Sequence, residues 1–63
     1  MLKDVKDIYI EYLLEWDGKN GPDTLIHFKL TSILKFIRLH KIDKYIIKGY
    51  KNNEWVIIVL KKH

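Results

Sequence analysis

The sequence predicts an α+β fold in which two helices, or three, precede a C-terminal antiparallel β-hairpin. Three observations support this fold class. Apolar residues recur at helical spacing over residues 2–16, residues 24–40 contain no glycine, proline or asparagine, and two β-branched runs flank a short polar turn near the C-terminus. The 63 residues are too few for two hydrophobic cores, so residues 1–63 are expected to form a single domain.

Residues 2–16 are expected to form an amphipathic helix. Asp4, Asp7, Glu11 and Glu15 follow the spacing of one narrow helical stripe, and apolar side chains cover most of the remaining surface. An apolar arc this wide exceeds what one small core covers, which predicts a second buried contact within the chain or with another subunit. The helix is expected to end in the glycine-rich segment 17–22.

A second helix is expected to begin near Pro22, which suits a first helical turn because its missing N–H group is not needed there. Two interpretations of residues 24–40 remain open. In one, a continuous helix is sandwiched between two apolar contacts. In the other, the chain turns near residues 29–31, and Thr31 or Ser32 caps a new helix over residues 32–40, as in a helix-turn-helix.

Residues 44–62 are expected to form the hairpin, with Asn52 and Asn53 in a two-residue primed turn because asparagine tolerates positive φ. This register places Tyr50 opposite Trp55, and it creates one uncharged face for the core and one face of mixed character. The core face comprises Tyr45, Ile47, Gly49, Val56, Ile58 and Leu60. The other face comprises Lys44, Ile46, Lys48, Tyr50, Trp55, Ile57, Val59 and Lys61, a mixture typical of a contact surface.

The formal net charge of +4 is unevenly distributed along the chain. Residues 1–17 contain two lysines and five carboxylates, whereas residues 18–63 contain ten lysines or arginines and three carboxylates. A polyanion is therefore expected to meet the later part of the chain, where the lysines of residues 35–51 are spaced along helix and hairpin.

The composition favours a cytoplasmic protein, in the host cytoplasm if the source is viral. There is no cysteine, no signal-peptide pattern, and no apolar run longer than the six residues of segment 55–60, against about 20 for a membrane-spanning helix. The absence of alanine and the heavy use of lysine, isoleucine and tyrosine suggest AT-rich coding, as in a phage, virus or mobile element.

The residues of an enzyme site are missing from the sequence. It has one serine, no cysteine and no glycine-rich phosphate loop, so we expect neither catalysis nor a cofactor. His27 and His40 are thirteen residues apart without a third ligand nearby, so no metal site is expected.

The helical segment Leu30–Ile42 followed by a hairpin resembles the winged helix-turn-helix family. In that family the helix before the wing lies in the DNA major groove, and the wing touches the backbone or the minor groove. The resemblance implies binding of double-stranded DNA by Thr31, Ser32, Lys35 and Arg38 on the helix and by Lys48, Lys51, Asn52 and Asn53 on the wing. The turn lacks the glycine common in that motif, and the single arginine argues for phosphate contacts over base readout.

The alternative function is a dimeric protein-interaction or inhibitor module that binds no nucleic acid. Tyr50 and Trp55 are expected either to stack on bases or to cover a partner, and a homodimer is expected because the apolar surfaces exceed one small core. A break near Thr31 would favour DNA binding. An unbroken helix with Leu25, Phe28, Phe36 and Leu39 buried against another copy would favour the protein module.

Overall fold

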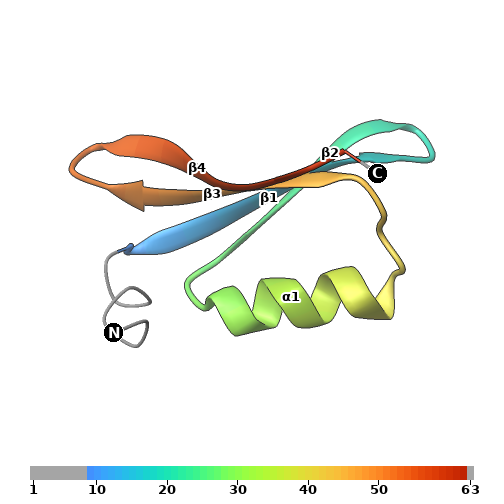
Figure 1. Ribbon diagram of the computed structural model, residues 1–63, viewed down its shortest axis with the longest axis horizontal. Helices are drawn as coiled ribbons and strands as arrows, with labels where there is room; N and C mark the ends of the chain where they lie inside the picture. The colour runs from blue at the N-terminus through green and yellow to red at the C-terminus, as the bar shows by residue number, and fades with distance from the viewer. Residues whose placement is uncertain (1–8, 63) are drawn as a thin grey trace.

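The computed structural model describes residues 9–62, which form one sheet covered on one face by one helix (Figure 1). Within these residues the sheet has four antiparallel strands in the order β2-β1-β3-β4. Two hairpins therefore lie side by side, and the helix connects them. The elements are β1 (Glu11–Gly18), β2 (Gly21–His27), α1 (Leu30–Leu39), β3 (Tyr45–Lys51) and β4 (Glu54–Lys61).

The predicted fold class of two or three helices before a hairpin is wrong, and the first error is in residues 11–18. This segment is strand β1, residues 9–10 before it are not helical, and residues 2–8 of the predicted helix lie outside the described residues. Tyr12 and Leu14 are buried, and Leu13 between them is only half-buried, which is the alternation of a strand. Because Glu11 and Glu15 are four residues apart, they share one helical stripe and equally one strand face, so their spacing could not separate the two structures.

The second error concerns the segment before α1. The glycine-rich break is the turn of a hairpin, in which Gly18 pairs with Gly21, and Gly21–His27 is strand β2 instead of a helix. Pro22 is tolerated because β2 is an edge strand. The chain does turn near the predicted break, but a strand precedes α1, so neither the continuous helix nor the helix-turn-helix is present. The elements of residues 9–62 therefore do not form the winged-helix arrangement.

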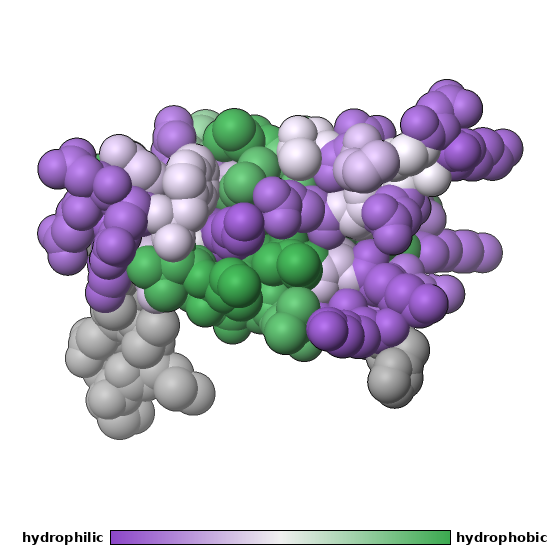
Figure 2. Space-filling model, turned by 90° about the horizontal axis from the view of Figure 1, so that it is seen from above, coloured by the Kyte–Doolittle hydropathy of each residue, from purple (hydrophilic) through white to green (hydrophobic). Residues whose placement is uncertain are grey.

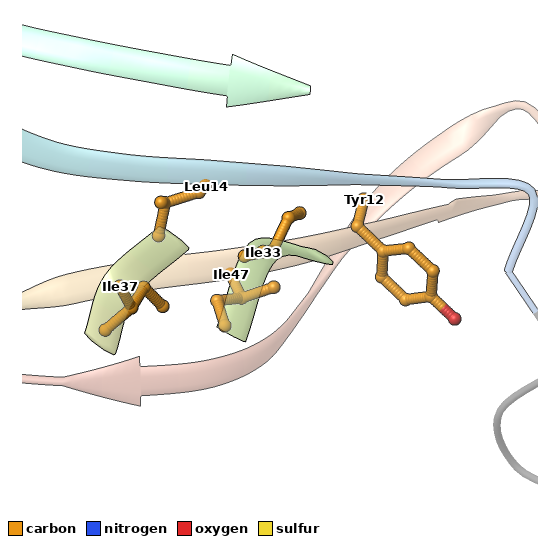
Figure 3. Packing of buried hydrophobic residues seen from close by; sticks show 5 residues of the cluster. All are labelled: Tyr12, Leu14, Ile33, Ile37 and Ile47. Carbon is orange, nitrogen blue, oxygen red and sulfur yellow. The ribbon is translucent and has the colours of Figure 1, made fainter. Parts of the chain in front are cut away.

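The hydrophobic core lies between α1 and the sheet (Figure 3). Ile33 and Ile37 are four residues apart on α1 and point toward the two central strands. They meet Tyr12 and Leu14 of β1 and Ile47 of β3. Leu14, Ile33 and Ile47 have no exposed surface, so the core depends on contacts between segments distant in the sequence.

The predicted β3–β4 hairpin is confirmed, including its turn. Asn52 and Asn53 have φ of 51° and 64°, the positive values that a primed turn requires. The predicted pairing holds from the turn to the partners Lys48 and Ile57.

A bulge next to Lys48 then shifts the rest of the hairpin by one residue, so that Ile47 pairs with Val59 instead of Ile58. As a result, Val59 joins Ile58 against the core. Leu60, which the sequence placed in the core, is 54% exposed and pairs with Ile46 on the far face.

Candidate functional surfaces

The two layers of the molecule present chemically different surfaces. The first, the helix layer, comprises residues 28–44, that is, α1 with its flanking loops. The second, the open face, is the side of the sheet that α1 does not cover (Figure 1). Each surface contains some of the residues that the sequence singled out.

The net charge of the described residues belongs entirely to the helix layer. Residues 28–44 contain five lysines or arginines and one carboxylate, Asp43, for a net of +4. The remaining described residues, 9–27 and 45–62, contain five lysines and five carboxylates and are neutral. The fold therefore separates a basic layer from a neutral sheet.

The basic side chains of the helix layer point away from the protein. Ile33 and Ile37 face the sheet, which leaves Lys35 and Arg38 on the outer side of α1, where both are exposed. Lys29 and Lys41, at the two ends of α1, are exposed too. Within residues 9–62 none of these four cations forms an ion pair. They are available to an external anion.

Lys29 occupies an unusual position for a lysine. It is the N-cap of α1 and makes no capping hydrogen bond through its side chain. Serine, threonine, aspartate or asparagine would be favoured there, and a cation is disfavoured near the positive end of a helix dipole. Its Nζ atom lies 5.8 Å from the centroid of the Phe28 ring, which is itself 66% exposed. Residues that are unfavourable for local structure, as lysine is at this N-cap, are commonest at functional sites.

The predicted DNA-binding residues are divided between the two faces. Thr31, Lys35 and Arg38 are exposed on α1, whereas Ser32 is half-buried. Asn52 and Asn53 are exposed at the tip of the β3–β4 hairpin.

The two predicted lysines of that hairpin are engaged elsewhere. The Nζ atom of Lys51 lies 5.4 Å from the centroid of the Tyr9 ring. Lys48 lies on the open face, where its Nζ atom is 3.5 Å from Oε1 of Glu15. Lys48 therefore lies on the opposite side of the sheet from Lys35 and Arg38. Lys29 was missed as a site residue because only the start of α1 reveals its position.

The open face combines exposed aliphatic and aromatic side chains around one ion pair (Figure 2). Ile26, Ile57 and Leu60 are each 54% exposed. Tyr50 and Trp55 are cross-strand neighbours with ring centroids 4.9 Å apart, and Trp55 is 39% exposed. The register places these side chains, with Leu13 and Ile46, on the same face.

The ion pair lies diagonally across the two central strands. Glu15 of β1 is opposite Ile46, and Lys48 of β3 is opposite Leu13, so the charged and the apolar residues alternate. The Glu15 and Lys48 side chains are 34% and 29% exposed, which leaves both within reach of a partner molecule.

The described residues offer no other recognisable site. Residues 9–62 contain no group of three histidine, aspartate or glutamate side chains suited to a metal ion. Among residues 9–62, no helix meets the length and hydropathy that a membrane span requires. A depression of about 480 Å³ at one end of the sheet is lined by both signs of charge, including Asp17, Asp23 and Lys61.

Comparison of the sequence with protein-family models found no match, and comparisons with curated proteins and with solved structures found none either. The interpretation of both surfaces therefore depends on their own chemistry.

Proposed function

We propose that the helix layer binds the phosphate backbone of double-stranded DNA. The observation that carries this proposal is the separation of charge: the +4 of the described residues lies in one layer, on exposed cations without carboxylate partners. Lysines that only maintain solubility would be interspersed with carboxylates, as they are in the sheet. In this proposal the chain is a cytoplasmic binding protein without catalytic activity.

The length of α1 suits such a contact. Ten helical residues extend about 15 Å, and Lys29 and Lys41 lie just beyond the two ends. Double-stranded DNA carries one negative charge per ~1.7 Å of its axis, so a duplex along α1 offers more phosphates than the layer has cations. The layer has one arginine and exposes Leu34 and Leu39, which favours backbone contacts with little base readout.

The test is a titration of labelled duplex DNA of mixed sequence at several salt concentrations. If Lys29, Lys35, Arg38 and Lys41 each neutralise one phosphate, the log–log slope of affinity against salt is roughly −3.6, from about −0.9 per phosphate. The Lys35→Glu, Arg38→Glu double variant is expected to lose binding. The matched control is Lys61→Glu, Lys62→Glu, which changes the net charge equally but lies outside the helix layer and should keep most of the affinity.

Absence of binding by the wild-type protein at low salt would refute the proposal, because electrostatic binding is strongest there. Equal losses in the two double variants would show that only the overall charge matters.

A second candidate function is protein interaction, favoured by the exposed aliphatic residues of the open face. We propose that the homodimer expected from the sequence forms through this face. The second apolar stripe that the sequence assigned to a long helix cannot provide the contact, since residues 21–27 are a strand.

A further inference from the structure

The geometry points to the open face as a two-fold symmetric interface, in which Glu15 of each copy meets Lys48 of the other. This inference deepens the proposed self-association and is independent of DNA binding. The proposed binding partner of the open face is a second copy of the chain.

The open face has the character and the size of an interface. Its centre contains half-exposed aliphatic side chains from all four strands, among them Ile26, Ile46 and Ile57. The molecule measures 35 Å along the strands and 19 Å across them, since Figure 1 is viewed down the shortest axis. The product of these two dimensions is of the same order as the ~800 Å² of surface that each partner buries in a stable complex. Exposed aliphatic and aromatic side chains gathered on one face are typical of protein interaction sites.

The arrangement of charge selects a second copy as the partner. A two-fold axis makes the same surface meet itself, so a residue i that contacts j is matched by j contacting i. An axis in the plane of the interface, along the diagonal from Leu13 to Ile46, brings Glu15 of one copy over Lys48 of the other. Each carboxylate then lies between two ammonium groups, and the apolar residues on the axis meet their own counterparts.

A partner of uniform charge would fit this face poorly, because it would repel either Glu15 or Lys48. The open face is also better suited to self-association than the helix layer. Two helix layers, each with a net charge of +4, would repel one another at close contact. Pairing through the open faces keeps both basic layers on the outside of the dimer, on opposite sides.

The experiment uses two single variants, Glu15→Lys and Lys48→Glu, alone and mixed. A dimer of either variant with itself gathers four like charges at its centre, whereas a mixed dimer places the two ammonium groups of one copy opposite the two carboxylates of the other. We expect sedimentation at micromolar concentration to show a dimer for the wild type and monomers for each variant alone. The equimolar mixture should form a dimer of mixed composition, identified by native mass spectrometry. The matched control variants, Lys35→Glu and Asp43→Lys, alter charge on the helix layer and should dimerise like the wild type.

The single variants are expected to fold, because a partly exposed ion pair contributes little to stability, and circular dichroism checks this. If either variant is unfolded, Ile57→Lys provides the same test, since Ile57 lies half-exposed on an edge strand and should yield a folded monomer. A monomeric wild type overturns the inference and the proposed self-association together, and leaves DNA binding untouched. A dimer that persists in both charge variants, with no preference for mixing, overturns this interface but not self-association elsewhere.

Discussion

Replacement of Gly49 by alanine tests how the sheet accommodates an aromatic ring. Gly49 lies in β3, and its backbone does not have the positive φ that would exclude alanine. A Cβ atom there would lie 2.6 Å from Cγ and 2.8 Å from Cε1 of Tyr9, and closer still to Cδ1. Separations under 3.0 Å do not occur in practice, so the Tyr9 ring must move.

The expected change in the free energy of unfolding combines two effects: the cost of displacing the Tyr9 ring, and the gain from replacing a glycine within a strand by alanine. Overpacking of this kind costs about 1–3 kcal/mol. Part of that cost is the edge contact between Tyr9 and Tyr12, whose centroids are 5.9 Å apart, since aromatic pairs contribute about 0.5–1.5 kcal/mol. Glycine itself destabilises a strand by roughly 0.5–1 kcal/mol relative to alanine, which offsets some of the loss. The midpoints of these two ranges, about 2 and about 0.75 kcal/mol, differ by about 1 kcal/mol, so the free energy of unfolding should fall by about that amount.

The assay is urea denaturation of a double-mutant cycle. Gly49→Ala is measured in the wild type and in a Tyr9→Ala background, where no ring opposes the new Cβ. In that background the same substitution should stabilise the protein by about 0.5–1 kcal/mol. An equal cost in both backgrounds would refute the reasoning, since the ring would then not be the cause.

Three further predictions follow from particular positions. Lys29→Ser should raise the free energy of unfolding, measured by urea denaturation, by about 1 kcal/mol, because serine caps α1 where lysine does not. The same variant should weaken DNA binding in the salt titration. Unchanged DNA affinity would remove Lys29 from the proposed site. Asn53→Ala should lower the free energy of unfolding by about 1 kcal/mol because Asn53 has positive φ, whereas Asn53→Gly should not lower it. Equal thermal midpoints for the two variants would argue against a primed turn. Leu14→Ala should cost about 2–5 kcal/mol because Leu14 is fully buried, and a smaller loss would place the core elsewhere.

The β3–β4 hairpin is the part of the fold that local sequence preferences predict correctly. Asn52 and Asn53 tolerate positive φ, and β-branched residues on both sides favour extended backbone. These preferences act over a few residues, so they could be read locally. The pairing near the turn was correct for the same reason, and it failed beyond Lys48, where a bulge that lets Val59 pack against the core shifted the register.

Contacts between distant segments make residues 11–27 a hairpin of β1 and β2, and they set which side chains each candidate surface contains. The spacing of Glu11 and Glu15 suits a helix and a strand alike, and the pairing of β1 with β2 and β3 selects the strand. The same pairing brings Glu15 beside Lys48, 33 residues away, on the face of the sheet opposite to α1. Local sequence patterns indicate which backbone conformation each segment prefers. The face of the sheet on which a side chain lies depends on contacts between segments distant in the chain.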